Sequence, residues 1–391
     1  MKILAVNAGS SSLKFQLLEM PEEKIITSGQ IERIGFDDAK FTIKVNGDKK
    51  SVEKSIKSHS VAVSHVLDAL IDLKIVSNYD EISGVGHRVV HGGEKFNDSV
   101  LITKEVLNEI ERLNDLAPLH NPANATGIRA FREILPNVSH VAVFDTAFHQ
   151  TMPKESYLYP VPYEWYKKYG IRKYGFHGTS HKFVSERAIE LLALDKSKII
   201  SLHLGNGCSI TAIKDGKSID TSMGFTPLAG AMMGTRSGDI DPSILPFVMD
   251  KEKWDIDKAI EALNNKSGLK GVSLKSSDMR DIVSGMESGD ENCRIALNLF
   301  AKRVCDYIGS YYFLLGGCDA LIFTAGIGEN SPVARKVILN RLQDFGITFD
   351  EKVNKVKGEE KVISTRESKI KVIVIPTDEE LVIARDTLRL M

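Results

Sequence analysis

Short apolar runs near the start of the chain predict strands, and a helical repeat follows them. "KILAV" (2–6) and "LKFQLLE" (13–19) are strand-like and flank the small-residue turn "NAGSSS" (7–12), which predicts a hairpin. "KFTIKVNG" (40–47) alternates as a further strand that ends in Asn-Gly. Apolar positions then recur at helical spacing within 58–76, at Val63, Val66, Leu67 and Leu70.

The pattern continues as buried strands alternating with helices. "ISGVGHRVVHGG" (82–93) is a buried strand that runs into a Gly-rich loop, helices are expected within 104–116 and 121–134, and a strand within 138–148. "ALIFTAGIGEN" (320–330) and "KIKVIVIPTDEEL" (369–381) are strands that run into polar turns. For the last helix we expect Thr377 as the N-cap, with Glu380 completing a capping box. Its apolar face would carry Leu381, Ala384 and Leu388. This order of elements predicts an α/β protein.

A second hairpin repeats the first. "KIISLHLGNGCSITAIKDGKSI" (198–219) is a strand, a small-residue turn and a strand, and aligning Gly9 with Gly205 places the two turns over each other. At 391 residues the chain is long enough for two domains. Residue identity between the two hairpins is slight, but the repeat coincides with the two domains expected from the length.

Composition narrows the classes of function. The formal net charge is −1, from 51 basic and 52 acidic residues, which argues against a general nucleic-acid or anionic-membrane surface. The four cysteines have no CxxC or metal-ligand spacing, and neither a signal-like N-terminus nor a long apolar run is present, so we expect a cytoplasmic protein without a transmembrane helix. All ten histidines lie between His59 and His203, which indicates that chemistry gathers in the middle of the chain.

The segment 153–181 is rich in tyrosine and interleaved with Lys and Arg. Aromatic and basic residues in this pattern are typical of two things, a single-stranded nucleic-acid site or a packing surface between domains or subunits. The balanced charge favours packing.

Several short stretches could bind an anion. Backbone N–H groups in the two small-residue turns could face successive phosphates, with Lys14 adding a point charge, although each turn alone is also an ordinary β-turn. No G-x-x-x-x-G-K-[ST] or early GxGxxG is present, so neither a Walker loop nor a Rossmann fingerprint applies. Arg88 and Arg236 lie in Gly-rich loops of separate halves, where each could form a salt bridge or clamp a carboxylate or phosphate.

The histidine pair His177 and His181 has i, i+4 spacing in "GFHGTSH". A zinc pair would need the Glu of H-E-x-x-H and a third ligand, and neither is evident. A hydrogen bond from His177 to a moving phosphoryl group fits the sequence better. Asp145 ends a buried strand in "FDTAFH", where acidic residues commonly face a ligand.

Ten motifs in this order resemble the acetate kinase (acetokinase) family over nearly the whole chain. They are "NAGSSSLKF", "GHRVVHGG", "LAPLHNP", "FDTAFH", "YGFHGTSH", "HLGNGCS", "GTRSGDIDP", "SSDMRDI", "AGIGEN" and "PTDEEL". The resemblance implies the duplicated actin-like, ribonuclease H-like α/β fold of acetate and sugar kinases, chaperone ATPases and actin, with a nucleotide in the cleft between two domains. It implies domains of 1–149 plus the C-terminal helix 377–391, and 150–376. It also implies a homodimer, and the balanced charge already argues against a nucleic-acid or membrane partner.

The reaction implied is ATP + acetate ⇌ ADP + acetyl phosphate with Mg²⁺, for which Mn²⁺ can substitute. Asn7 and Glu379 resemble the family's metal-site residues, and Ser10 and Ser12 belong to its phosphate-facing loop. Arg88 and Arg236 match the arginines that hold the carboxylate and the phosphoryl group. His177 and Asp145 match catalytic residues of the family. Four residues match the pocket around the acetate methyl, with His120 nearby: Val90, Leu119, Phe176 and Pro227. The residues that match nucleotide contacts are Lys14, His203, Leu204, Gly205, Asn206, Gly207, Asp278, Met279, Arg280, Gly326, Ile327, Gly328, Glu329 and Asn330.

Two rival readings remain at this stage. One is a propionate or butyrate kinase of the same family, and the other is a non-catalytic ATP-driven switch of the actin or chaperone type. For a kinase, the acetate carboxylate is ionised at pH 7, because carboxyl groups titrate near ~4, and it needs no general base. We therefore expect Asp145 to orient an arginine or a magnesium-bound water.

Overall fold

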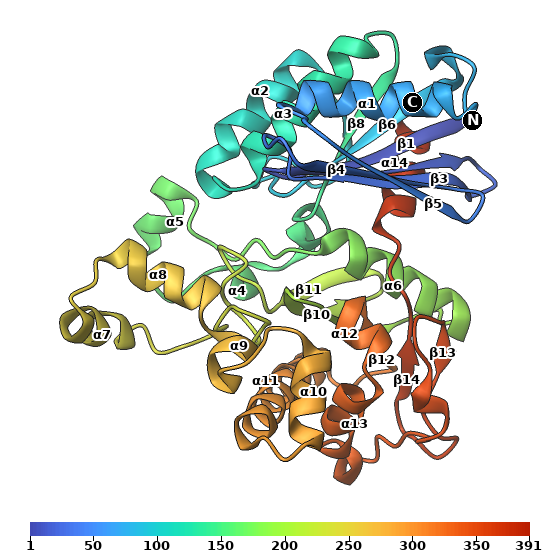
Figure 1. Cartoon of the computed structure of the whole chain (residues 1–391). Helices are drawn as coiled ribbons and strands as arrows, with labels where there is room; N and C mark the ends of the chain where they lie inside the picture. The colour runs from blue at the N-terminus through green and yellow to red at the C-terminus, as the bar shows by residue number, and fades with distance from the viewer. The chain divides into compact units, whose positions relative to one another are not determined.

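The computed structural model describes residues 1–391, which form two compact units (Figure 1). Unit 1 comprises Met1–Phe148 and Asp378–Met391, and unit 2 comprises His149–Thr377. None of the helices combines the length and the apolar character needed to cross a membrane.

Unit 1 contains one mixed sheet and four α-helices, and short 3-10 turns at Tyr79–Glu81, Leu113–Leu116 and Ala147–Thr151 adjoin them. The strands are β1 (Lys2–Ala8), β2 (Ser12–Glu19), β3 (Lys24–Glu32), β4 (Ala39–Val45), β5 (Asp48–Lys54), β6 (Ile82–Val89), β7 (Val100–Leu101) and β8 (Ser139–Phe144). The helices are α1 (His59–Asp72), α2 (Lys104–Arg112), α3 (Asn121–Ile134) and α14 (Glu379–Leu390).

The sheet of unit 1 is covered on both faces. Its order is β5-β4-β3-β2-β1-β6-β8-β7, with β1, β6 and β8 parallel and the other neighbours antiparallel. Side chains alternate along β1, so Leu4 and Val6 join a core with α1 and α3, whereas Ile3 and Ala5 pack with α14. Gly86 of β6 lets α14 approach closely, since a Cβ there would overlap Ile383.

Unit 2 is built from a second mixed sheet and ten α-helices. Its strands are β9 (Lys198–Leu204), β10 (Cys208–Lys214), β11 (Lys217–Thr221), β12 (Ala320–Thr324), β13 (Lys361–Val362) and β14 (Lys371–Val374). The helices are α4 (Lys154–Tyr157), α5 (Tyr163–Tyr169), α6 (Gly178–Leu192), α7 (Ile244–Glu252), α8 (Ile256–Asn265), α9 (Gly268–Ser273), α10 (Met279–Glu287), α11 (Glu291–Leu315), α12 (Ala325–Asn330) and α13 (Pro332–Asn340). Two further 3-10 turns lie at Gln343–Phe345 and Val353–Lys355.

The two sheets share one topology, which confirms the predicted duplication. The order β11-β10-β9-β12-β14-β13 matches β3-β2-β1-β6-β8-β7 strand for strand, including which neighbours are parallel. The hairpins differ by one residue, because Ala8 pairs with Leu13 but Leu204 pairs with Cys208. The alignment through Gly9 and Gly205 therefore slips by one after the turn, and each later position faces the opposite side of its sheet.

Most predicted elements are present, and three local predictions were wrong. Arg88 lies within β6 and not in the loop after it. "GIGEN" is part of a short helix, α12, and not a turn. Thr377 does not cap the last helix: the Asp378 side chain accepts from the N–H of Leu381 at 2.9 Å, and the Thr377 N–H donates to Glu329 Oε1 at 3.1 Å.

The tyrosine-rich segment packs in part against itself. The Arg172 guanidinium lies 3.7 Å from the ring centroid of Tyr157 and 5.3 Å from that of Tyr174, and both Arg172 and Tyr174 are buried. Trp165 and Tyr169 of this segment remain exposed. Burial of the central stack agrees with the packing interpretation.

Candidate functional site

In unit 1, an arginine and an aspartate meet at the carboxyl ends of two parallel strands. Arg88 in β6 donates from Nε to Asp145 Oδ1 at 3.0 Å and from Nη2 to Oδ2 at 2.5 Å, and Asp145 directly follows β8. Asp145 is 1% exposed. Burial alone would lower the pKa of Arg88, but the Asp145 carboxylate raises it above its usual range. The pair is a bidentate clamp of fixed geometry.

Asn7 and Glu379 add oxygen atoms to the same region of unit 1. Arg88 Nη1 donates to Asn7 Oδ1 at 3.3 Å, and Glu379 is the first residue of α14. Glu379 Oε1 is buried without a hydrogen-bond partner. Burial raises the pKa of Glu379 to about 7, with Arg88 acting in the opposite direction and Asp145 in the same one.

These oxygens suit a small, hard cation. Mg²⁺ is usually held by one or two carboxylates together with waters and phosphate oxygens, and an unpartnered buried carboxylate oxygen is a suitable ligand. The structure contains no cluster of three His, Cys, Asp or Glu residues that could hold a metal. The side-chain oxygens of Asn7 and Glu379 are of the kind that binds magnesium.

Two buried asparagines of α3 hold the loop after β6. Asn124 accepts from the Val90 N–H at 3.1 Å and donates to the Ala8 carbonyl at 2.8 Å, so it ties that loop to the end of β1. Asn121 accepts from the His91 N–H at 3.1 Å. Neither asparagine was predicted from the sequence as a functional residue. Their signal was an Asn pair, in "NPANATG", on a helix whose neighbours are small and apolar.

In unit 2, His177 and Arg236 meet at the turn between β9 and β10. A Cβ on Gly207 would lie 3.4 Å from Arg236 Nη1 and 3.5 Å from His177 Nε2. Arg236 Nη1 also donates to the Pro227 carbonyl at 3.3 Å, and no carboxylate contributes to the pKa of Arg236. Burial lowers the pKa of Arg236. Arg236 and His177 therefore both lie against the backbone of Gly207.

A hydrogen-bonded network of histidines and serines extends from His177 into the interior of unit 2. His177 Nδ1 is 2.9 Å from Ser209 Oγ, and His181 Nε2 is 2.7 Å from the same atom. The His177 ring stacks on that of His203, with centroids 3.9 Å apart, and His203 Nδ1 is 2.8 Å from Ser180 Oγ. The concentration of histidines seen in the sequence is therefore partly one cluster in unit 2.

A cavity of about 670 Å³ lies within unit 2, a volume typical of small-molecule sites. Eight of the residues that the resemblance assigns to the nucleotide line it, together with three that sequence reasoning missed, Ser277, Ser331 and Lys357. The eight are Gly205, Asn206, Asp278, Met279, Arg280, Gly326, Ile327 and Asn330. His203, Leu204, Gly207, Gly328 and Glu329 lie on the same strand, turn and helix without lining the cavity.

A buried arginine that sequence reasoning missed supports this cavity. Arg335 of α13 donates to the carbonyls of Gly328 at 2.7 Å and Glu329 at 2.9 Å, at the end of α12. It also donates to Asn354 Oδ1 at 2.9 Å and to the Val356 carbonyl at 2.7 Å, next to Lys357. Burial lowers its pKa to about 10. Arg335 thereby joins α12 to the segment that carries Lys357.

The other residues assigned by resemblance are distributed over both units. In unit 1, Lys14 is exposed on β2, Ser12 begins that strand after Ser10 in the turn, Val90 is buried, and Leu119 is 78% exposed next to His120. In unit 2, Phe176 is buried and Pro227 is partly buried.

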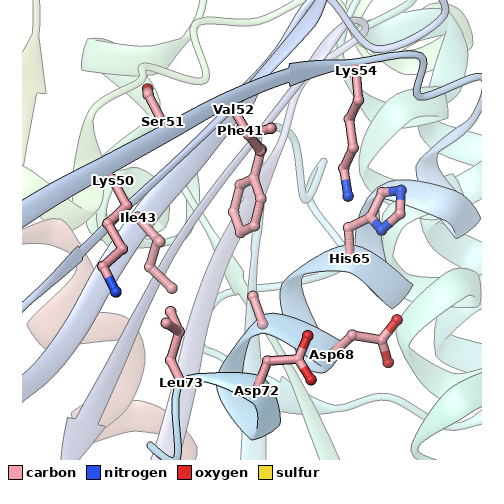
Figure 2. A pocket seen from close by; sticks show the side chains of 11 residues that line it. Phe41, Ile43, Lys50, Ser51, Val52, Lys54, His65, Asp68, Asp72 and Leu73 are labelled. Atoms are coloured by element: carbon pink, nitrogen blue, oxygen red, sulfur yellow. The ribbon is translucent and has the colours of Figure 1, made fainter.

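A second cavity, of about 370 Å³ in unit 1, contains none of the residues assigned from the sequence. Figure 2 shows Lys50 and Lys54 of β5 opposite Asp68 and Asp72 of α1, with the Phe41 ring between them.

Comparison with known proteins agrees with the motifs. The family model described as the acetokinase family matches residues 2–385. A protein named acetate kinase from Bacillus cytotoxicus is 60% identical over 391 residues, which is 100% of this chain and 98% of that protein. The crystal structure of Porphyromonas gingivalis acetate kinase is 48% identical with a TM-score of 0.96, covering 100% of this chain and 99% of that one. That of a propionate kinase from Francisella tularensis is 43% identical with a TM-score of 0.94, covering 100% of both chains. The chain therefore belongs to the acetokinase family.

Proposed function

We propose that this chain catalyses the reversible, Mg²⁺-dependent transfer of a phosphoryl group between ATP and acetate, giving acetyl phosphate and ADP. The observation that carries this reaction is the convergence of Arg236 and His177 at Gly207 without a carboxylate to neutralise the arginine. A partly buried cation in that state needs an anion, and a transferring phosphoryl group supplies one.

The main difficulty of this reaction is electrostatic. Acetate is already an anion at pH 7, so it needs no general base, but it must approach a polyanion. Two unit charges ~4 Å apart at an effective dielectric of ~20 repel by about 4 kcal/mol. Arg236 and His177 of unit 2 and Arg88 of unit 1 are the groups that we propose offset this repulsion during in-line transfer.

Asp145 acts by orienting Arg88. Its two carboxylate oxygens accept from Nε and Nη2, which fixes the plane of the guanidinium and leaves Nη1 directed to Asn7. We propose that Arg88 binds the acetate carboxylate and that Val90, Leu119, Phe176 and Pro227 surround the methyl group. Asp145 transfers no proton in this scheme.

Asn7 and Glu379 would hold the magnesium ion, for which Mn²⁺ can substitute, and the bound ion would supply positive charge to offset that of the phosphates. The buried unpartnered Oε1 of Glu379 supports this assignment. We propose that the residues around the 670 Å³ cavity of unit 2 bind the nucleotide. Lys14 and the Ser10–Ser12 loop are the further residues that we propose for its phosphates.

We propose further that 1–149 with 377–391 and 150–376 act as the two functional domains, and that the chain is a cytoplasmic homodimer that uses no nucleic acid or membrane. The homodimer is what the family resemblance implies, and the net charge of −1 supports the absence of polyanionic partners. Light scattering of the purified chain measures the oligomeric state directly.

A hydroxamate assay tests the reaction. Purified protein with ATP and Mg²⁺ should form acetyl phosphate only when acetate is present, and excess EDTA should abolish the product. ATP hydrolysis that is independent of acetate, without acetyl phosphate, would instead support an ATP-driven switch.

A propionate kinase is the second candidate, because a propionate kinase structure matches the chain at a TM-score of 0.94. Each added methylene changes binding by only about 1–3 kcal/mol, so both acids should react, with acetate preferred. The ratio of kcat/KM across acetate, propionate and butyrate distinguishes the two functions.

A further inference from the structure

Ser209 of β10 occupies the centre of a hydrogen-bonded chain that ends at His177. Its Oγ lies 2.9 Å from His177 Nδ1 and 2.7 Å from His181 Nε2, and His181 Nδ1 lies 2.9 Å from Ser201 Oγ. Ser201, Ser209 and His181 are all fully buried. The order of the chain is therefore Ser201, His181, Ser209, His177, and all four belong to unit 2.

The number of hydrogen atoms available to these four side chains allows only one arrangement of donors and acceptors. His181 is neutral, because burial pushes its pKa well below the usual range, so it has one N–H and one acceptor nitrogen. His181 is the only hydrogen-bond partner of Ser201 Oγ, so the Ser201 hydroxyl must donate to His181 Nδ1 to be satisfied. His181 then donates from Nε2 to Ser209, and Ser209 donates its own hydrogen to His177 Nδ1.

The reversed arrangement leaves a buried hydroxyl unsatisfied. If His177 Nδ1 carried the hydrogen, Ser209 would donate to His181 Nε2, and His181 Nδ1 would donate to Ser201. The Ser201 hydrogen would then have no acceptor in the interior, which is unfavourable because the hydroxyl has lost its hydrogen bonds to water. If both histidines donated to Ser209, the hydroxyl hydrogen of Ser209 would be unsatisfied in the same way.

We propose that Ser209 is a positioning residue that holds neutral His177 with its hydrogen on Nε2, the nitrogen that faces Gly207 and Arg236. A His177 in this form donates a hydrogen bond to the transferring phosphoryl group without first taking up a proton. This role rests on the proposed phosphoryl transfer, but the tautomer itself is a property of the free enzyme.

The tautomer can be measured without turnover. Long-range ¹H–¹⁵N correlation spectra of full-length protein labelled with ¹⁵N-histidine, with His177 assigned by its absence in His177→Gln, should show a neutral ring protonated on Nε2. In Ser209→Ala the signal should move toward a mixture of both tautomers. A wild-type His177 protonated on Nδ1, or an unchanged tautomer in Ser209→Ala, overturns the proposal.

Kinetics provides the second readout. We expect Ser209→Ala to lower kcat about tenfold, with the KM values for ATP and acetate changed less than about twofold. Ser209→Thr, which keeps the hydroxyl, should recover most of kcat. Thr211→Val removes a buried hydroxyl of the same strand that bonds Thr221 and not His177, and it should leave kcat unchanged. Equal losses in Ser209→Ala and Thr211→Val contradict the role.

If the wild-type protein makes no acetyl phosphate, the proposed function fails while the spectra still decide the tautomer. If Ser209→Ala does not fold, Ser201→Ala tests the same chain from its far end. That variant removes the hydrogen that orients His181, so a mixed His177 tautomer is expected, and an unchanged one overturns the proposal.

Discussion

Arg88 in unit 1 and Arg236 in unit 2 are matched in their assigned chemistry but differ in their electrostatic surroundings. Arg88 binds Asp145 through two hydrogen bonds, and this carboxylate raises its pKa against the effect of burial. Arg236 contacts a backbone carbonyl and the Met233 sulfur, and burial lowers its pKa. One cation is neutralised within the fold, and the other is not.

The difference indicates a division of tasks. A guanidinium fixed by a buried carboxylate keeps its orientation but gives up much of its net attraction for an anion. A cation without a partner attracts an anion strongly, at a cost in folding stability. We infer that Arg88 orients the monovalent acetate, whereas Arg236 supplies charge to the phosphoryl group.

The largest expected effects on kcat come from replacing Asp145, which neutralises Arg88, or Arg236 itself. Asp145→Asn leaves Arg88 without its counter-charge, so we expect kcat to fall about 10²–10³-fold and the free energy of unfolding to fall by about 3 kcal/mol. Activity is measured with the hydroxamate assay at saturating Mg²⁺, and stability by urea unfolding. A variant that keeps most of its kcat would rule out an essential charge at this position.

Arg236→Met should lose a similar factor in kcat with the opposite effect on stability. Replacing an uncompensated cation by an apolar side chain of similar length should leave the free energy of unfolding unchanged or raise it by about 1 kcal/mol. The two variants are controls for each other. Equal destabilisation of both would show that Arg236 has a compensating partner.

Buried histidines should behave alike in the two units. Burial lowers the pKa of His140 in unit 1 and of His149 in unit 2 to about 4, from a usual 6.5. Because the unfolded chain binds these protons first, each contribution is complete above about pH 6.5 and is lost as the pH falls toward about 4. The loss is about 3 kcal/mol for each group.

Urea unfolding at several values between pH 7.5 and pH 4.5 tests this dependence. The free energy of unfolding should fall less steeply with decreasing pH in His140→Asn and in His149→Asn. In each variant the slope should decrease by the equivalent of about one bound proton. A slope that either replacement leaves unchanged would mean that the histidine concerned is protonated in the folded state.

The sequence predicted what depends on local pattern. Hairpin strands, the α1 face and Asp145 at a strand end follow from apolar runs and their termini. Helix α12 could not be predicted, since two glycines in six residues read as a turn. It forms because Glu329 Oε1 accepts from the Ala325 N–H at 2.7 Å and Arg335 binds the carbonyls at its end. Those partners come from positions that no local pattern links.

The same limit applies to single positions. Thr377 and Asp378 are both good N-caps, and the choice between them depends on Glu329, 48 residues away, which holds the Thr377 N–H. Arg335 reads as a surface residue of an amphipathic helix, because a buried arginine satisfied by carbonyls has no signature in the sequence. The motifs that resemble the family identified candidate residues, but not the groups that support them.

Arg335 is a third kind of arginine in this structure, because it is a buried cation whose hydrogen bonds go only to carbonyl and amide oxygens. Arg335→Met should release α12 from the segment at Lys357, so we expect the KM for ATP to rise about tenfold, with kcat much less affected. Lys336→Met, at the next position on α13, removes only an exposed ion pair with Glu351 and serves as the control. A KM that rises equally in both variants contradicts a role for Arg335 at the cavity.

The smallest expected effect concerns the pocket that we propose for the acetate methyl. Val90 is buried and its N–H is held by Asn124, whereas Leu119 is 78% exposed in this structure, although both were assigned to the same pocket. Val90→Ala removes two methyl groups from a fixed wall, so the propionate-to-acetate ratio of kcat/KM should rise about fivefold, or about 1 kcal/mol. Leu119→Ala should change this ratio less, because an exposed side chain gives way to a longer acid without substitution. A ratio unchanged in Val90→Ala but raised in Leu119→Ala would assign the contact with the methyl group to Leu119.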